Sequence, residues 1–358
     1  MINNPFSDLV VIELASVLAG PAVGMFFSEL GAKVIKVENP KTKGDMTRSW
    51  KHPQEDPKAK TSAYYHAINW NKESRFLDLS QKTDYESLKS LIKTADILIS
   101  NYLPQSADKL KVNFQAIKDI NPSIIYASVS AYGIQSQKPG FDALMQAETG
   151  WMHMNGSPNG PPIKMPVALI DILAGHQLKQ GILTALILRF REPRAYQVSV
   201  SLYDAALSAL ANQASNYLNL DVIPQRKGSQ HPNIAPYGDL YLTKDNYYLI
   251  SAIGTDKQFK DLLNILQLST YLNDLRFMDN TSRVKNRTAL NDILKASFKK
   301  INGHELLLKA EEKSIPIGRI NNLKEVFESQ QAQALILKQL EKDGSISRRV
   351  KTNIFKIN

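Results

Sequence analysis

The sequence predicts an α/β protein, with a large doubly wound domain around a parallel sheet and a second, smaller α/β domain. Short apolar runs rich in β-branched residues alternate with helical stretches along the first part of the chain. Glycine and proline punctuate many of these runs. At 358 residues, 43% of them apolar, the chain is long enough for a substantial core and for more than one domain.

The chain opens with an expected β-α-β unit. Residues 9–13 are predicted to form a buried strand, residues 22–30 a helix and residues 33–38 a second strand. Pro21 suits the first turn of that helix, and Gly31 suits the position just after its end. Strands joined in this way are parallel and need a right-handed crossover.

The same alternation continues further along the chain, and it is the basis for the doubly wound fold. The polar residues 41–60 are expected to form a long functional loop. The expected strands are residues 75–79, 97–100, 124–128 and 194–202, and the expected helices are residues 85–93, 114–119, 172–190 and 203–218. Gly175 and Gly181 would let the longest of these helices pack closely against a neighbour.

A turn-rich segment at residues 225–238 is expected to separate the domains. Residues 1–224 would form the first part of the large domain. Residues 225–315 would form the small domain, which includes a strand at residues 247–252. Residues 316–358 are expected to return to the large domain.

The composition excludes several kinds of site. There is no cysteine, which excludes disulfides, a thiol nucleophile and any metal site that needs Cys ligands. The six histidines are scattered without the close spacing of zinc motifs, so no metal is expected.

The formal net charge of +10 would suit an anionic partner such as nucleic acid or a membrane surface. However, the basic residues are spread along the chain and no nucleic-acid-binding motif accompanies them. No apolar run is long enough to cross a bilayer, and the first residues do not resemble a signal peptide. We therefore expect a cytoplasmic protein that binds neither nucleic acid nor membrane.

Asp171 directly precedes the expected helix at residues 172–190. Taken alone, it is most simply an N-cap, whose carboxylate accepts hydrogen bonds from the first free N–H groups of the helix. The helix dipole would also keep such a carboxylate ionised. Because an ionised, positioned carboxylate is what a covalent nucleophile requires, capping and catalysis are compatible at this residue.

A series of short motifs runs through nearly the whole chain. They lie at residues 16–21, 30–38, 44–48, 71–74, 77–79, 95–102, 141–146, 171–175, 231–238 and 315–319. In content and order they resemble the motifs of the family III CoA-transferases (the CaiB/BaiF family), which include formyl-CoA:oxalate and carnitine CoA-transferases. This resemblance implies a Rossmann-like large domain built from both chain ends and a homodimer of two interlinked chains.

The resemblance also implies a chemistry for particular residues. The aspartate of the family's D-x-x-A-G segment, here Asp171, would attack an acyl-CoA thioester and later carry CoA as an aspartyl-CoA thioester. Asp142 matches an acidic residue beside the nucleophile in some members, and its other interpretation is a turn or helix cap. Coenzyme A and acyl-CoA are implied as substrates, with no permanently bound cofactor. The implied CoA-binding residues are Ser16, Val17, Leu18, Ala19, Asn39, Leu77, Asn101, Tyr102, Lys109 and Phe141.

Some of these positions carry their own evidence, for or against. The cation of Lys109 suits the phosphates of CoA, although alone it would be interpreted as a solvated helix charge. Asn39 stands where the family often has a basic residue. Leu18 replaces a glutamine of the oxalate enzymes, so oxalate is a poor prediction for the acceptor. The hypothesis that remains is succinyl-CoA as donor with a branched or aromatic acid as acceptor.

Three other functions stay open. An α-methylacyl-CoA racemase of the same fold would need two proton-exchanging groups, and this chain has Phe141 where the family racemases have a histidine. A non-catalytic CoA-binding protein is disfavoured because Asp171 is retained. A nucleic-acid binder is motivated by charge alone. A transferase is favoured because it needs only the carboxylate.

The implied homodimer would place the active site between the large domain of one subunit and the small domain of the other. Residues 231–238, a loop rich in proline and small residues, would then lie at the acyl end of the site. The alternative is that this loop is only a rigid connector between domains.

Overall fold

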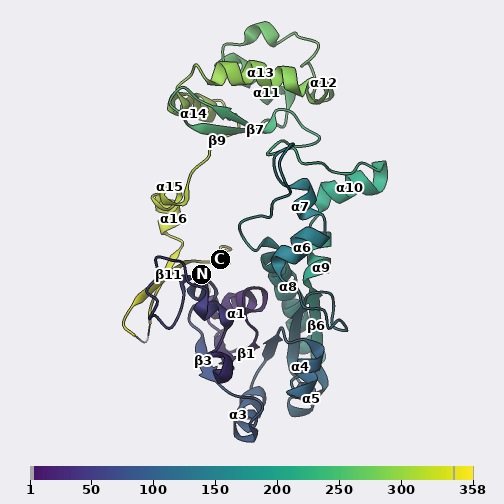
Figure 1. Ribbon diagram of the computed structural model, residues 1–358, viewed down its shortest axis with the longest axis vertical. Helices are drawn as coiled ribbons and strands as arrows, with labels where there is room; N and C mark the ends of the chain where they lie inside the picture. The colour runs from purple at the N-terminus through teal and green to yellow at the C-terminus, as the bar shows by residue number, and fades with distance from the viewer. Residues whose placement is uncertain (1–3, 342, 358) are drawn as a thin grey trace. The chain divides into compact units, whose positions relative to one another are not determined.

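The structure is a computed structural model, and it describes residues 4–341 and 343–357. The chain forms two compact units (Figure 1). Unit 1 contains the described parts of residues 1–151, 164–222 and 334–358, and unit 2 contains residues 152–163 and 223–333. Compactness alone does not show that a unit folds independently, so the domain limits at residues 224/225 and 315/316 stay a prediction.

Unit 1 is built on a six-stranded sheet in which every neighbouring pair of strands is parallel. The strands are β1 (Val10–Leu14), β2 (Lys33–Glu38), β3 (Glu73–Phe76), β4 (Ile97–Ser100), β5 (Ile125–Ser130) and β6 (Tyr196–Ser201). Their order is β3-β2-β1-β4-β5-β6, which is the doubly wound Rossmann order. The predicted fold class is therefore confirmed for this unit. The order in which successive strands are added to the sheet reverses between β1 and β4, although these two strands are parallel.

Helices cover both faces of this sheet, because alternate strand residues point to opposite sides. Val11, Ile97 and Ile99 pack into one core cluster, with residues of α1 (Ala19–Glu29) and α8 (Leu169–Arg191). Ile12 and Leu98 point the other way, into a second cluster. Helices α3 (Lys82–Ile92), α4 (Pro104–Lys109) and α5 (Phe114–Ile120) contribute to that second cluster.

The longest helix begins earlier than the sequence indicated. Helix α8 starts at Leu169, and its N-cap position is Ala168, which offers no capping side chain. Asp171 therefore lies inside the first turn, and the N-cap expectation for this residue was wrong. At Gly175, an added Cβ would lie 3.3 Å from the carbonyl oxygen of Ala19, which shows how closely α8 packs against α1.

The remaining α-helices of the first 222 residues are short, and two 3-10 helices lie at Pro40–Thr42 and Met46–Ser49. The short α-helices are α2 (Ala63–Ile68), α6 (Asp142–Glu148), α7 (Trp151–Met154), α9 (Leu202–Ser208) and α10 (Ala211–Leu220). The single helix expected at residues 203–218 is thus two helices. Ala211, at the start of the second, has a φ of 48°, in the left-handed region that ordinary side chains rarely adopt. Among the described residues, no helix has both the length and the apolarity that a membrane span requires.

Unit 2 contains a three-stranded antiparallel sheet of order β7-β8-β9. Its strands are β7 (Tyr237–Leu242), β8 (Tyr248–Ala252) and β9 (Ile317–Arg319), and its helices are α11 (Asp256–Ile265), α12 (Asn280–Lys285), α13 (Arg287–Phe298), α14 (Gly303–Glu312), α15 (Leu323–Phe327) and α16 (Gln330–Gln333). The rings of Tyr241 and Phe298 stack in its core with centroids 4.2 Å apart. This unit therefore has a core of its own.

The last part of the chain returns to unit 1 as a β-hairpin, formed by β10 (Ile336–Leu340) and β11 (Ile346–Val350). Strand β11 packs against α2. Beyond the hairpin, Glu29 of α1 accepts hydrogen bonds from the backbone N–H groups of Thr352 and Asn353 at 3.0 and 2.8 Å. Residues from both chain ends therefore build unit 1.

Candidate active site

A cavity of about 480 Å³ opens in unit 1 at the carboxyl ends of β1 and β4. In doubly wound sheets, ligands bind in the crevice at the point where the strand order reverses, and this cavity lies there. Its volume falls in the usual range for small-molecule sites. Its walls come from the β1–α1 turn, from residues 36–46 and 101–106, and from residues 129–131, 139–141, 171 and 202.

The cavity brings together most of the residues that the sequence predicted for the site. The predicted residues that line it are Ser16, Val17, Leu18, Ala19, Asn39, Asn101, Tyr102, Phe141 and Asp171. Leu77, Lys109 and Asp142 are not among the lining residues. Leu77 packs partly buried against the second core cluster, and Lys109 is exposed at the end of α4. Contacts of Leu77 and Lys109 with CoA therefore stay a prediction.

The β1–α1 turn is fixed by a side chain from the neighbouring strand end. Asn101, just after β4, accepts a hydrogen bond from the Ser16 backbone N–H at 3.2 Å. Its side-chain amide donates in return to the Ser16 carbonyl at 2.9 Å. Asn101 thus bridges the two strands at whose ends the cavity opens, and this holds part of the cavity wall in place.

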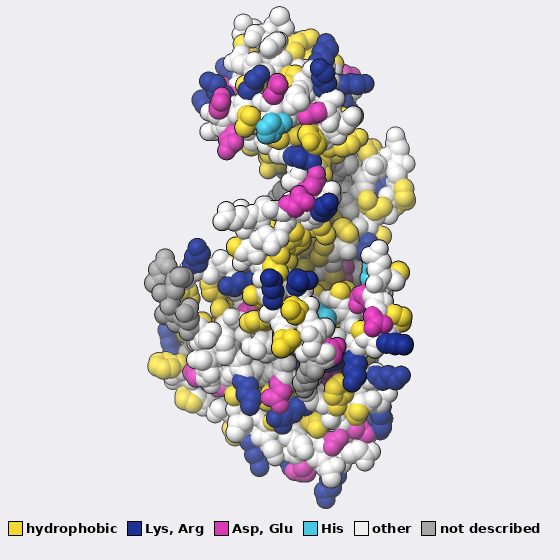
Figure 2. Space-filling model, turned by 90° about the vertical axis from the view of Figure 1, so that its left-hand side faces the viewer, with side chains coloured by type: hydrophobic (Ala, Val, Ile, Leu, Met, Phe, Trp, Pro, Cys, Tyr) yellow, Lys and Arg dark blue, Asp and Glu magenta, His cyan; other side chains and the backbone are white. Residues whose placement is uncertain are grey.

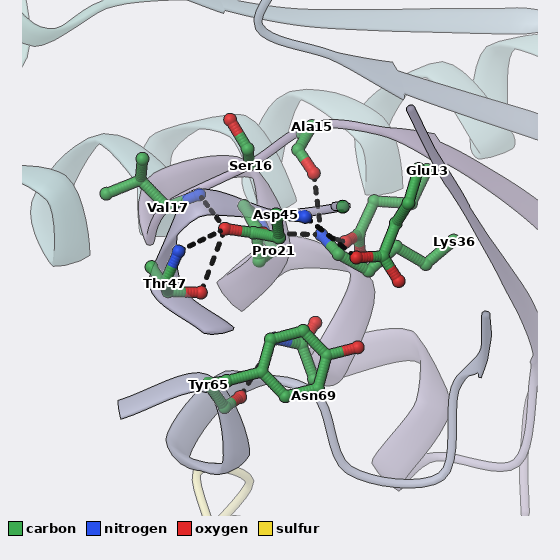
Figure 3. Close-up of polar contacts among 12 residues, drawn as sticks. Glu13, Ala15, Ser16, Val17, Pro21, Lys36, Asp45, Thr47, Tyr65 and Asn69 are labelled. Atoms are coloured by element: carbon green, nitrogen blue, oxygen red, sulfur yellow. Dashed lines mark hydrogen bonds and ion pairs between the residues drawn. The ribbon is translucent and has the colours of Figure 1, made fainter. Parts of the chain in front are cut away.

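Four buried charged side chains lie beneath this turn, and three of them, Glu13, Lys36 and Asp45, are labelled in Figure 3. Lys36 pairs with Glu13 at 2.8 Å and with Asp45 at 2.9 Å. Lys72 pairs with the second oxygen of Glu13 at 2.8 Å. All four side chains are at most 1% exposed, and two carboxylates balance two ammonium groups. We call these residues the buried charge network.

The two lysines of the buried charge network respond differently to burial. Burial alone would lower the pKa of Lys36, but the nearby carboxylates of Glu13 and Asp45 outweigh it and raise the pKa above its usual value. Burial lowers the pKa of Lys72 to about 8, because its attraction to Glu13 is partly cancelled by repulsion from Lys36. Sequence reasoning missed this network. The available signal was a charged residue, Glu13 or Lys36, inside an otherwise apolar strand.

Asp171 reaches the cavity from the first turn of α8. The residue is 7% exposed, and no hydrogen bond to its carboxylate is found among residues 4–341 and 343–357. The backbone N–H of Ile170 instead donates to Asp142 at 2.7 Å. The other oxygen of Asp142 accepts from the side chain of Gln146 at 2.6 Å. Asp142 therefore accepts a hydrogen bond from the first turn of α8, which is the role that the sequence assigned to Asp171.

This arrangement decides the charge state of Asp171. Burial, and then the negative charge of Asp142, raise the pKa of Asp171 to about 7. The expectation that the start of the helix keeps this carboxylate ionised was therefore wrong. The reason is that the N–H of Ile170 is directed to Asp142, while Asp171 is buried without a compensating hydrogen bond.

The sequence pattern of CoA-transferase family III matches residues 6–354. The chain belongs to this family. It is similar to succinate–glutarate CoA-transferase of Agrobacterium fabrum, with 37% identity over 98% of this chain and 89% of that protein. It is also similar to human succinyl-CoA:glutarate CoA-transferase, with 33% identity over 91% of this chain and 74% of that protein.

The fold agrees with this assignment. A CAIB/BAIF family protein from Brucella suis superimposes with a TM-score of 0.85 and 36% identity, covering 99% of this chain and 93% of that one. As a family III CoA-transferase, the chain is a transferase enzyme, and CoA-transferases use CoA thioesters as substrates. Within residues 4–341 and 343–357, no group of three or more His, Asp or Glu side chains could hold a metal ion.

A catalytic role for Asp171 would make the rate of CoA transfer depend on pH. Because the pKa of Asp171 is raised to about 7, its carboxylate ionises as the pH rises through that value. We expect kcat/KM for the acyl-CoA donor to increase over the same interval and then to level off, because kcat/KM reports the free enzyme. Asp142→Asn removes the neighbouring charge and should move the midpoint to lower pH.

The control is Asp119→Asn, because Asp119 also accepts a side-chain hydrogen bond from a glutamine four residues away, Gln115, but lies exposed on α5. Its pH profile should match that of the wild type. A wild-type midpoint near the ordinary value of an aspartate, about 4, would contradict the prediction.

Proposed function

We propose that the chain moves CoA from an acyl-CoA donor to a carboxylic acid acceptor, with Asp171 as the covalent nucleophile. The observation that carries this proposal is the position of the Asp171 carboxylate. It is buried at the cavity wall, and within the described residues it accepts no hydrogen bond. Such a group is destabilised in its charged form, so it is more nucleophilic than a solvated aspartate once it is ionised.

The proposed reaction has four displacement steps. An Asp171 oxygen attacks the thioester carbonyl of the donor and releases CoA thiolate, which gives a mixed anhydride. The thiolate then attacks the Asp171 carbonyl carbon and releases the donor carboxylate, which gives aspartyl-CoA. The acceptor carboxylate attacks this thioester and again releases CoA thiolate. The thiolate finally attacks the acceptor's acyl carbon, which forms the new thioester and restores Asp171.

The cavity walls suit this sequence of steps. The β1–α1 turn and Tyr102 would contact CoA, while Phe141, which is 54% exposed, would cover the reacting end against water. We further propose that Lys109 meets a phosphate of CoA from outside the cavity. Phe141 also argues against the racemase alternative, because it offers no proton where a second acid or base would be needed.

Nucleic-acid binding gains no support from the face of the molecule that Figure 2 shows. In Figure 2, the Lys and Arg side chains on the visible face lie scattered among acidic and uncharged side chains. A nucleic-acid site would gather its basic residues into a patch or stripe on one face. The net positive charge is instead consistent with anionic substrates such as acyl-CoA.

We propose succinyl-CoA as the donor and a short dicarboxylate of the glutarate class as the acceptor. Relatives that align over more than nine-tenths of this chain carry the names succinate–glutarate and succinyl-CoA:glutarate CoA-transferase. Comparing kcat/KM over a panel of succinate, glutarate, oxalate, branched and aromatic acids tests the choice. Oxalate as the best acceptor would contradict it, because Leu18 offers no polar group to that acid.

We also propose that the active form is a homodimer of interlinked chains. The support is the family resemblance, and residues 231–238 of a second copy are the candidates for the acyl end of the site. The molar mass in solution, measured by light scattering during gel filtration, should be twice that of one 40.1 kDa chain. A mass equal to one chain in the active protein would contradict this proposal.

Mass spectrometry of the intact protein tests the proposed nucleophile. Wild-type protein incubated with succinyl-CoA should gain the mass of CoA less one water, and hydroxylamine should remove this adduct. Asp171→Ala should show no adduct while still binding CoA. An adduct that persists in the variant would show that another group is the nucleophile.

A further inference from the structure

The β1–α1 turn contains a backbone conformation that its residue does not favour. Val17 has a φ of 73°, in the left-handed region that β-branched residues very rarely adopt. In the same turn of dinucleotide-binding domains, glycines meet such demands without strain. A strained conformation of this kind persists only where surrounding contacts hold it, and it is found most often at functional sites.

Asn101 holds Ser16, and the next residue of the turn, Val17, is held by Asp45. The backbone N–H of Val17 donates to Oδ1 of Asp45 at 3.3 Å. The same oxygen accepts from the backbone N–H and the hydroxyl of Thr47, at 3.0 and 2.8 Å. These bonds place a carboxylate, whose side chain is 1% exposed, directly behind the strained residue of the turn (Figure 3).

Asp45 is in turn held by the sheet. Its Oδ2 pairs with Nζ of Lys36 at 2.9 Å. That ammonium group also donates to Glu13 at 2.8 Å and to the carbonyl oxygen of Ala15 at 2.7 Å. The strained turn is therefore tied through Asp45 and Lys36 to both β1 and β2.

We propose that Asp45 is a positioning residue for CoA binding: it holds Val17 in the left-handed conformation and so keeps residues 16–19 in the shape that forms the cavity wall. This inference rests on the proposed function, in which CoA occupies that cavity. Asp45 acts through the turn and does not react. Its side chain is buried and both of its oxygens are already engaged.

The proposal separates binding from chemistry. Without Asp45, the Val17 backbone relaxes to an unstrained conformation, and only a fraction of molecules has the binding-competent turn. The apparent dissociation constant for CoA rises in inverse proportion to that fraction. Asp171 is carried by α8 and not by this turn, so the covalent step should proceed normally once CoA is bound.

The test is calorimetric titration of the full-length protein with CoA, together with steady-state kinetics using succinyl-CoA. Asp45→Ala should raise the Kd for CoA and the KM for the donor about tenfold, with kcat changed less than about threefold. Asp96→Ala is the matched control. Asp96 also accepts from a backbone N–H, that of Val10, and pairs with a cation, Arg189, but it does so at the amino end of β1.

A second substitution tests the strain itself. Val17→Gly removes the side chain that disfavours a positive φ, so the turn no longer needs the hydrogen bond to Asp45 to keep its conformation. Adding Val17→Gly to Asp45→Ala should bring the Kd for CoA back to within about threefold of the wild type. If the loss caused by Asp45→Ala is the same with valine or glycine at position 17, the proposal is overturned.

Two further outcomes would contradict the proposed role of Asp45. Equal losses of CoA affinity in Asp45→Ala and Asp96→Ala, or a fall in kcat at unchanged KM, would overturn the proposal. If Asp45→Ala does not fold, Asp45→Asn is used, which keeps an acceptor oxygen but loses the charge that holds Lys36. Its Kd should then rise by a smaller factor, and an unchanged Kd would overturn the proposal.

Wild-type protein that binds CoA without transferring it refutes the proposed function alone, whereas failure to bind CoA refutes both.

Discussion

Asp171→Asn should lower kcat for CoA transfer at least about a thousandfold, because an amide oxygen cannot form the anhydride on which both halves of the reaction depend. The substituted side chain is nearly the same size, and the original carboxylate makes no hydrogen bond within the described residues that the change would break. The Kd for CoA should therefore stay within about threefold of the wild type. Steady-state kinetics with succinyl-CoA and calorimetric titration with CoA measure the two quantities.

The control for this substitution is Asp84→Asn. Asp84 is also an aspartate in the first turn of a helix, but that helix is α3, and its carboxylate accepts from the backbone N–H of Asp78 at 2.8 Å. Turnover of this control should stay within about twofold of the wild type. If Asp171→Asn keeps a tenth or more of the wild-type kcat, Asp171 is not the nucleophile.

Glu13→Gln should cost about 3–5 kcal/mol in the free energy of unfolding, the range measured when one partner of a buried ion pair is removed. Glu13 is the carboxylate that serves both lysines of the buried charge network. Its loss leaves Lys36 with Asp45 alone and leaves Lys72 without an ionic partner. The side chain at position 13 also has little room to move, since a Cβ added at Gly24 would lie 1.9 Å from Oε2 of Glu13.

Urea unfolding curves at neutral pH measure this loss. The control is Glu86→Gln, which removes a carboxylate paired with Lys89 on the exposed surface of α3. Such exposed pairs contribute about 0–1 kcal/mol, so the unfolding midpoint should barely move. Equal midpoints for the two variants would show that the buried charge network adds nothing to stability.

The sequence predicted the central strands well, because a strand buried on both faces carries a continuous apolar signal. The predicted limits of β2 and β4 coincide with the observed ones. Strand β3 lies at the sheet edge, is mostly exposed and runs over Glu73–Phe76. The apolar residues that suggested a strand at residues 75–79 include Leu77 and Leu79, which follow the strand and pack into the core beneath it.

From the sequence, only those site residues could be predicted that lie within short sequence motifs. Residues around the β1–α1 turn and Asp171 lie in local patterns that the family resemblance identifies. The members of the buried charge network are far apart in sequence, at positions 13, 36, 45 and 72. The parallel register of β1 and β2 pairs Glu13 with Lys36, whereas Asp45 and Lys72 come from segments outside these two strands. The start of α8 was misjudged for a similar reason, since the acceptor of the Ile170 N–H is Asp142, on a different helix.

The return of the chain end to unit 1 has a consequence for how the protein is made. The six strands of the sheet leave the ribosome before residues 223–333, whereas the hairpin that packs against α2 follows those residues. At about 5–20 residues per second, synthesis of the intervening segment takes on the order of ten seconds. During that time the nascent sheet lacks the hydrogen bonds from Thr352 and Asn353 to Glu29. Until the chain end is made, the surfaces of α1 and α2 that it contacts stay uncovered by it and are open to chaperones and to misassociation.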